Sequence, residues 1–120
     1  MIKLIVAGGR DFTDYQKVEA HLCKYLVGEG ASRETVQIVS GGATGVDSLA
    51  KRFAIEYLFE YKEFTADWAK HNKAAGPIRN KQMADYGDAL IAFWDWKSKG
   101  TKNMIDNMSA LKKPYMIVRI

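Results

Sequence analysis

Apolar residues are distributed along the chain in short runs that alternate with helical patterns. Residues 2–7 (IKLIVA), 36–40 (VQIVS) and 89–93 (ALIAF) are near-continuous apolar runs, and the first two stop at paired glycines. Apolar runs of this length, bounded by turn residues, predict buried β-strands. A weaker strand is expected within residues 60–64, and the sequence YMIVR predicts a fifth strand at 115–119.

Four helices are expected between these strands, because apolar residues there recur at intervals of three and four. The first helix is expected over about 14–27, with Thr13 opening a capping box. The second follows a glycine turn and runs over about 46–57. The third is expected over 77–87, beginning at its proline, and the fourth opens at a Gly-Thr pair and covers 100–113, with Pro114 as its stop.

Strands that alternate with amphipathic helices predict an α/β fold, because a parallel crossover needs a helix. We therefore expect one domain over residues 1–120: a small doubly wound, Rossmann-like parallel sheet of about five strands in the order 3-2-1-4-5, with helices on both faces. In such a sheet, ligands bind beyond the carboxyl ends of the strands. The loops 8–13, 41–45 and 94–100 are expected to meet there. Residues 65–76 are expected to form an irregular, functional loop.

The composition is that of an ordinary globular domain, with 48% hydrophobic and 27% charged residues. The longest apolar stretches are far below the roughly 20 residues that cross a bilayer, and no signal-peptide pattern opens the sequence, so we expect a cytoplasmic protein without a membrane span. The single cysteine, Cys23, has no partner for a disulfide or a metal site, and no cofactor is indicated. A net charge of +4 favours anionic partners.

The turn GGATG at 41–45 lies between a predicted strand and a predicted helix. Glycines allow backbone N–H groups to approach a ligand closely, and the helix behind them offers unsatisfied N–H groups to an anion such as phosphate. The same turn is also compatible with tight packing alone. Neither of the two common phosphate-binding glycine motifs, GxGxxG and GxxxxGK[ST], is present.

A second glycine turn, GGRDF, follows the first strand. Gly8 and Gly9 permit close approach of a ligand. Arg10 can bind phosphate through two hydrogen bonds, and Asp11 can accept one from a ribose hydroxyl. The alternative is a local ion pair between Arg10 and Asp11, with Phe12 as an apolar plug beneath the first helix; for Phe12 the plug is the favoured interpretation.

Arg79 and Asn80 fall in the first turn of the third predicted helix, where acidic residues normally suit the helix dipole. An arginine at that place suggests an external anion. Asp47, in the first turn of the second helix, is explained by the same dipole, and Asp88 by a cap before the fourth strand. Neither carboxylate needs a catalytic role.

The remaining candidates are two histidines, one aspartate and three tryptophans. We expect His21 to be structural, whereas His71 lies in the 65–76 loop and is freer to contact a ligand. Asp67 is a third candidate carboxylate beside Asp47 and Asp88. Trp94 and Trp96 flank Asp95 within the predicted site loop 94–100, where large rings cover a ligand, a partner or the core. No catalytic triad or carboxylate pair emerges from the spacing.

Five motifs in chain order, GGRDF, SGGATGVDSLA, TADW, AAGPIRN and KGT, resemble the SLOG superfamily of Rossmann-like proteins. The resemblance is to its small single-domain branch, called YspA-like or YAcAr, and spans nearly the whole chain. The superfamily also contains the DNA-processing protein DprA and the LOG phosphoribohydrolases, which release a base from a nucleoside monophosphate. The resemblance to this branch implies binding of nucleotides or nucleotide-derived ligands.

The resemblance implies that a phosphate is bound by the glycine turn, by the arginine of the AAGPIRN motif and by a second glycine turn. The implied residues are Gly41, Gly42, Thr44, Gly45, Arg79, Gly100 and Thr101. In LOG enzymes the arginine works with a glutamate in a GTxxE motif. Here Met104 occupies the glutamate position, and WDWKSKGT replaces the usual PGGxGT. Both departures argue against LOG-type hydrolysis and leave ligand binding intact.

Three functional hypotheses follow. The first is a module that binds a nucleotide-derived ligand, such as a nucleoside monophosphate, an NAD fragment or an ADP-ribose-like molecule. In it, Arg79 and the 41–45 turn hold phosphate, Asp11 contacts ribose, and a tryptophan such as Trp68 covers the base. The second is a nucleotide N-glycosidase in which an aspartate replaces the missing glutamate. The third is single-stranded nucleic-acid binding of the DprA kind. Because related proteins assemble, the resemblance also implies that this protein can form a homo-oligomer.

Overall fold

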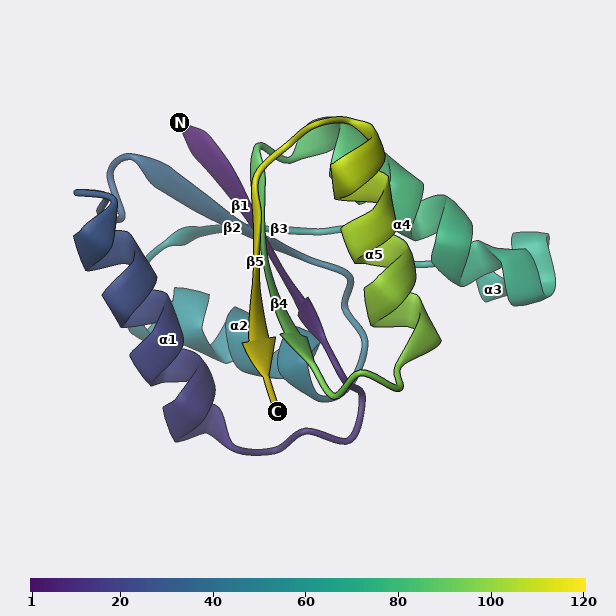
Figure 1. The fold of residues 1–120 in the computed structure, drawn as a ribbon, viewed down its shortest axis with the longest axis horizontal. Helices are drawn as coiled ribbons and strands as arrows, with labels where there is room; N and C mark the ends of the chain where they lie inside the picture. Colours follow the sequence, from purple (N-terminus) through teal and green to yellow (C-terminus); the bar gives the residue numbers. More distant parts are fainter.

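A computed structural model describes all of residues 1–120 and shows one five-stranded sheet in which every pair of neighbouring strands is parallel. The strand order is β3-β2-β1-β4-β5, which confirms the predicted topology (Figure 1). The strands are β1 (Ile2–Gly8), β2 (Val36–Ser40), β3 (Glu60–Glu63), β4 (Ala89–Trp94) and β5 (Tyr115–Arg119).

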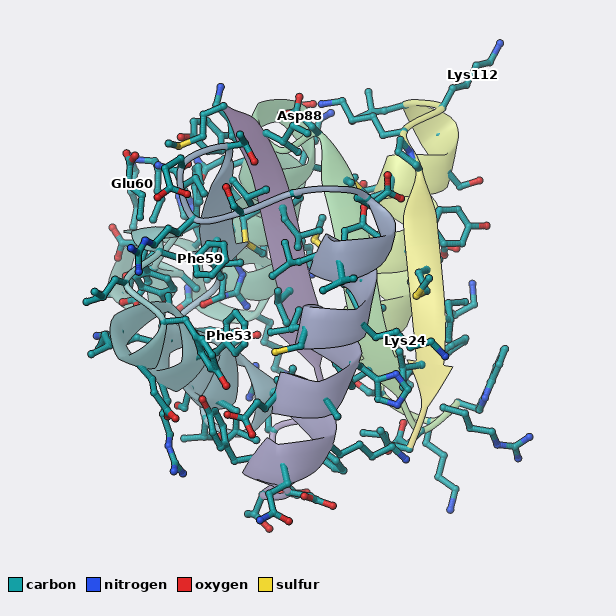
Figure 2. All side chains as sticks on the ribbon, turned by 90° about the vertical axis from the view of Figure 1, so that its left-hand side faces the viewer. Lys24, Phe53, Phe59, Glu60, Asp88 and Lys112 are labelled. Atoms are coloured by element: carbon teal, nitrogen blue, oxygen red, sulfur yellow. The ribbon has the colours of Figure 1, made fainter.

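Helices cover both faces of the sheet. They are α1 (Tyr15–Gly28), α2 (Val46–Glu56), α3 (Trp68–His71), α4 (Ala75–Tyr86) and α5 (Lys99–Ala110), with a short 3₁₀ helix, η1 (Asn72–Ala74), between α3 and α4. The core contacts place α1 and α2 on one face and α4 and α5 on the other. Seen from the side of α1, this helix crosses in front of the sheet, and β5 lies at one of the two edges of the sheet (Figure 2).

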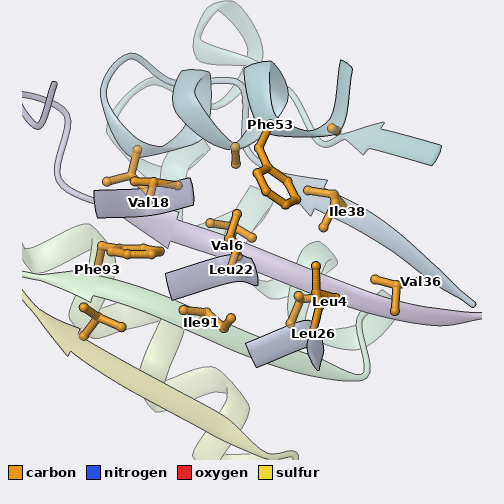
Figure 3. Close-up of a cluster of buried hydrophobic side chains, with 14 of the residues drawn as sticks. Leu4, Val6, Val18, Leu22, Leu26, Val36, Ile38, Phe53, Ile91 and Phe93 are labelled. Atoms are coloured by element: carbon orange, nitrogen blue, oxygen red, sulfur yellow. The ribbon is translucent and has the colours of Figure 1, made fainter. Parts of the chain in front are cut away.

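The core has two halves because side chains of a strand alternate between its two faces. On the face of α1 and α2, strand residues such as Leu4 and Phe93 pack against helix residues such as Leu22 and Phe53 (Figure 3). On the other face, residues such as Leu90 pack against the inner sides of α4 and α5. The central strands are therefore buried on both sides, which is why their sequences read as unbroken apolar runs.

Several helix starts differ from the sequence-based predictions. The cap of α1 is Asp14, whose carboxylate accepts from Lys17 N–H at 3.1 Å, so the predicted capping box at Thr13 is wrong. The helix α4 begins at Ala75, two residues before Pro77, because η1 leads directly into it and proline is tolerated in the first turn of a helix.

The segment 65–76, expected to be irregular, contains α3 and η1, and the start of α3 is capped by the carboxylate of Asp67. The helix α5 begins at Lys99, one residue before the predicted Gly-Thr start, with Ser98 as its cap. The helix ends at Ala110, before the predicted end at 113, so Leu111 lies beyond it and is 41% exposed.

Lys113, in the turn before β5, holds the end of α4. Its ammonium donates to the carbonyl oxygens of Ala84, Asp85 and Gly87 at 2.7, 3.0 and 2.8 Å. Carbonyls at a helix C-terminus lack partners within the helix, and a cation there also suits the helix dipole. This contact fastens α4 to the turn between α5 and β5. None of the helices is long and apolar enough to span a membrane.

Candidate ligand-binding cavities at the carboxyl ends of the strands

A cavity of about 590 Å³ lies where β1 and β4 end. All three loops that were predicted to meet contribute to its wall, together with α4 and α5, which confirms that prediction. A volume in this range is typical of small-molecule sites. The polar and glycine residues of its lining are Gly8, Gly9, Arg10, Asp11, Asp47, Arg79, Asn80, Asp95, Lys97, Ser98, Gly100 and Thr101.

A second cavity of about 320 Å³ adjoins the first. Arg10, Ala43 and Arg79 line both cavities, so two guanidinium groups stand between them. The remaining wall of the smaller cavity consists of Gly41, Gly42, Thr44, Thr65, Ala66 and Trp68. The two cavities together are lined by all of the residues proposed to contact phosphate, ribose or base except Gly45, whereas His71 lines neither cavity.

Gly45 serves the packing of the turn against the β1 loop. Its φ of 74° lies in the left-handed region, and a Cβ at this position would overlap Gly9 O and the backbone of Arg10. The next residue, Val46, donates its N–H to Gly9 O at 3.1 Å. The two glycine turns are thus in direct contact, and a residue with a side chain at position 45 would separate them.

The 41–45 turn also retains free donors. The N–H groups of Gly42, Thr44 and Gly45 have no hydrogen-bond partner within the chain, whereas that of Ala43 donates to Asp47 Oδ2 at 3.1 Å. Packing and anion binding, the two alternatives for this turn, are therefore compatible: glycine is required for the contact between the loops, and donors remain for a ligand.

Asp47 has a larger role than its position in the first turn of α2 indicated. Its side chain is buried, and burial raises its pKa to about 6, against the opposing effects of the Ala43 N–H and the nearby charge of Arg79. A carboxyl group with such a pKa, in the wall of a cavity, is able to exchange a proton near neutral pH. The sequence could not show this, because the burial comes from residues far along the chain.

Arg79 is the fifth residue of α4, so its predicted place in the first helical turn is wrong. It is buried, and its guanidinium bonds inside the protein: Nε donates to Asn80 Oδ1 at 3.0 Å, and Nη1 donates to Gly41 O. Burial lowers its pKa, while the carboxylate of Asp47 opposes that effect. Nη2 has no partner in the chain and remains available to a ligand in either cavity.

Asn80 joins α4 to the start of α5. Its Nδ2 donates to Gly100 O at 3.2 Å and to Asn103 Oδ1 at 3.0 Å, while its Oδ1 accepts from Arg79. Thr101 is buried, and its N–H and hydroxyl bond to Ser98 Oγ. These polar side chains are occupied by the protein itself. Their contribution is to hold Arg79 and the α5 turn in place.

Arg10 and Asp11 do not form the ion pair that was the alternative interpretation of their sequence. Arg10 lies over the ring of Trp68 instead, with 5.7 Å between the guanidinium carbon and the ring centroid. Trp68 is 49% exposed at the smaller cavity. Phe12, as expected, packs against the core below α1. The site therefore combines the charge of Arg10 with the partly exposed ring of Trp68.

Trp94 and Trp96 stack on one another, with their ring centroids 4.3 Å apart, and Trp94 is buried at the end of β4. Neither ring lines the two cavities. Asp95 between them lines the larger cavity, and its pKa is lowered because its carboxylate accepts from the N–H groups of Ser98 and Lys97. Asp95 is therefore a weaker base than Asp47.

Two of the other candidates, Asp88 and His21, have structural contacts away from the cavities. Asp88 accepts from Lys3 N–H at 2.8 Å, at the opposite end of the sheet, which agrees with a role in opening β4. His21 packs its ring edge-to-face with Phe93. Met104, at the position where LOG enzymes carry glutamate, is buried in the wall of the larger cavity.

The fold and the cavity define a Rossmann-like α/β protein with a polar site at the carboxyl ends of its strands. The model of the YspA, cpYpsA-related SLOG family (YAcAr) matches residues 2–71. The chain is also 33% identical over 109 residues to the gene 61 protein of Mycobacterium phage D29, which covers 86% of this chain and 85% of that protein. This chain belongs to the YAcAr family of SLOG proteins.

Solved structures of other proteins share the fold. The DNA-processing protein A (DprA) of Streptococcus pneumoniae superposes with a TM-score of 0.76 at 17% identity over 98% of this chain. DprA of Helicobacter pylori, which binds single-stranded DNA, has a TM-score of 0.71 at 20% identity over 97% of this chain. The protein TM1055 superposes with a TM-score of 0.68 at 18% identity over 96% of this chain. The chain spans 50%, 64% and 72% of these three chains, respectively.

Proposed function

We propose that this protein is a binding module for a nucleotide-derived ligand, held at the carboxyl ends of β1 and β4. The observation that carries the proposal is the position of Arg10 and Arg79 between two adjoining cavities, beside a glycine turn with free N–H groups. Guanidinium groups and turn amides are the donors that bind phosphate in proteins. Family membership supports the same class of ligand.

The parts of the ligand can be assigned from the chemistry of the walls. The phosphate lies between Arg10 and Nη2 of Arg79, within reach of the 41–45 turn. The exposed ring of Trp68 offers a stacking face for a base. Asp11, which is exposed and lines the larger cavity, is positioned to accept from a ribose hydroxyl.

The test is to titrate the protein with nucleoside monophosphates, NAD and ADP-ribose, and to repeat the titration with Arg10→Ala. Arg10 is the better probe than Arg79, because it is exposed and its loss breaks no hydrogen bond of the fold from its side chain. Loss of a charged contact worth about 1.5–3 kcal/mol weakens binding tenfold or more. Arg33→Ala, which removes an exposed arginine paired only with its neighbour Glu34, is the matched control.

Equal affinity of the wild-type protein and Arg10→Ala for every bound nucleotide would contradict the site assignment. If no nucleotide binds, and single-stranded DNA binds with an affinity that grows with its length and falls steeply with salt, the DprA-like alternative replaces the proposal. The positive net charge and the likeness in fold to DprA motivate that arm of the experiment.

Asp47 favours a second candidate function, the hydrolysis of a nucleotide N-glycosidic bond. A buried carboxylate with a pKa of about 6 in the cavity wall can take a proton from an attacking water. The water oxygen would bond to C1′ as the C1′–N bond breaks and its proton passes to Asp47, and the leaving nitrogen would take up a proton from solvent. Free base in the reaction mixture, abolished in Asp47→Asn, would establish this activity; binding without any base release would exclude it.

A further inference from the structure

The outer side of β5 is an open strand edge. β5 pairs with β4 on one side only, and Ile120 N–H donates to Trp94 O across that pair at 3.1 Å. Backbone groups alternate in direction along a strand, so those of Tyr115, Ile117 and Arg119 point away from β4. Such a row of N–H and C=O groups is a template for another extended chain.

Only one of these outward groups has a partner. Lys17, in α1, donates from Nζ to Arg119 O at 3.1 Å. The N–H groups of Tyr115, Ile117 and Arg119, and the other two carbonyls, bond to nothing in the chain. The edge is therefore open over most of the strand.

A groove of about 570 Å³ runs along this edge, between β5 and α1. It shares no lining residue with the two cavities described above. Figure 2 shows Lys24 of α1 facing β5. The groove is lined by Lys17, His21, Lys24, Tyr25, Gly28, Glu29, Met116, Ile117, Val118 and Arg119.

The groove is positively charged. Lys17, Lys24 and Arg119 have no carboxylate within salt-bridge distance, and Glu29 is the only acidic residue of the lining. Met116, on the strand itself, is 45% exposed. An exposed strand edge is thus bordered by three unpaired cations and an apolar surface.

We propose that this groove binds an extended acidic segment of a partner protein, which adds to the sheet as a sixth strand beside β5. Main-chain hydrogen bonds to the open edge supply affinity, and the flanking side chains supply specificity. The inference is independent of the nucleotide site, because the two regions share no lining residue.

The alternation of β5 predicts the pattern of the partner. Val118 faces the core on the α1 side, so Met116 lies on that side too, whereas Ile117 packs toward α5. Residues of the added strand would alternate in the same way. We therefore expect acidic residues at every second position, spaced by about 6.6–6.8 Å, facing Lys17 and Lys24, with apolar residues between them.

Charge and chemistry distinguish this partner from two others. A second copy pairing through β5 would bring two sets of Lys17, Lys24 and Arg119 together, and like charges at an interface are unfavourable. A nucleic-acid strand carries phosphates but has no alternating backbone N–H and C=O groups to pair with the edge. An acidic peptide satisfies both the charge and the hydrogen bonds.

The experiment uses a labelled, end-capped peptide of alternating Glu and Val, titrated against the full chain. Peptides of alternating Lys and Val and of separate Glu and Val blocks are the controls for charge and for pattern. Binding of the alternating acidic peptide is expected to slow amide hydrogen exchange at Ile117 and Arg119, because their N–H groups become bonded. Purely electrostatic binding would leave those two amides unchanged.

Two variants separate the contributions. Ile117→Pro removes one outward N–H while leaving the bonds to β4 intact, as proline is tolerated on strand edges; Ile117→Val keeps the N–H and is its control. The double variant Lys17→Glu/Lys24→Glu is expected to bind the acidic peptide about tenfold more weakly. Two exposed ion pairs with the peptide are lost, and the new carboxylates repel it. Lys81→Glu with Lys112→Glu, remote from the groove, makes the same change in net charge.

Tight binding of the alternating acidic peptide, protection of the two amides and loss on Lys17→Glu/Lys24→Glu would establish the site. The proposal is overturned if the peptide does not bind, binds without protecting the amides, or binds the block sequence equally well. Preferential binding of oligothymidylate in the groove, lost in the same lysine variant, would also overturn it. Nucleotide titration of the lysine variant reports separately on the cavity site.

Discussion

At the scale of single residues, Asp47 shows how one side chain can join two elements and remain chemically active. Its carboxylate accepts the Ala43 N–H and lies near Arg79, so it couples the glycine turn to α4. The same burial that positions it makes its ionised form costly. Stability should therefore depend on the protonation of this residue.

We predict that folding stability attributable to Asp47 falls as pH rises from about 4 to about 6. The folded-state pKa of about 6 exceeds the unfolded value of 3.8, so the folded protein binds more protons in that window. The difference corresponds to about 3 kcal/mol. Urea unfolding of wild type and Asp47→Asn at several pH values tests this: wild type should lose stability relative to the variant only within that window. The exposed Asp85→Asn controls for loss of a carboxyl group.

Gly45→Ala should destabilise the protein by at least about 2 kcal/mol, because φ is positive and the new Cβ would overlap the Gly9 carbonyl. Gly100→Ala is the matched control. A Cβ there meets nothing within 4 Å, and alanine is favoured inside a helix, so stability should stay the same or rise by up to about 1 kcal/mol. Thermal unfolding of both variants is the measurement; an equal loss at the two glycines would contradict the packing role of position 45.

At the scale of elements, the loop that precedes α5 forms part of the wall of the larger cavity, and the start of α5 depends on Ser98. The Ser98 hydroxyl accepts from Thr101 N–H at 3.3 Å and bonds to the Thr101 hydroxyl. Ser98→Ala is expected to cost about 1 kcal/mol, the usual value of a helix cap. Ser109→Ala, at an exposed position of the same helix, should change stability far less, and chemical denaturation compares the two. A similar loss at both serines would argue against the cap.

The elements themselves were largely predictable from the sequence, because apolar periodicity records burial directly. Strand order, the two covered faces and the meeting of three loops all followed from it. Exact helix starts did not follow: Thr13 and Asp14 are both good caps, and local sequence cannot choose between them. The early start of α4 follows from η1, which leads directly into it and leaves Pro77 in the first helical turn.

Within the candidate site, the sequence indicated the residues but not their arrangement. The internal hydrogen bonds of Arg79 and Asn80 involve Gly41, Gly100 and Asn103, which are 20 or more residues away along the chain. Such contacts have no local signature. The raised pKa of Asp47 could not be predicted from the sequence for the same reason.

At the scale of the whole molecule, one sheet is shared by two apolar clusters on its opposite faces. The two clusters share the same strands, so exposing either cluster to water also exposes one face of the sheet. We therefore predict a single cooperative unfolding transition. Leu22→Ala and Met108→Ala remove fully buried side chains from opposite faces and should each cost about 2–5 kcal/mol. Far-ultraviolet circular dichroism and tryptophan fluorescence should report coincident midpoints in each variant; separated midpoints would show independent halves.

The contact of Lys113 with the end of α4 has a consequence for the reactivity of the surface. Lys112 and Lys113 are adjacent in the sequence, yet Lys112 is exposed, while all three N–H bonds of Lys113 are directed at carbonyl oxygens. In the native protein an amine-acylating reagent should modify Lys112 well before Lys113, and the difference should vanish in denaturant. Peptide mass spectrometry can thus use this neighbouring pair as an internal gauge of whether a variant has kept its fold.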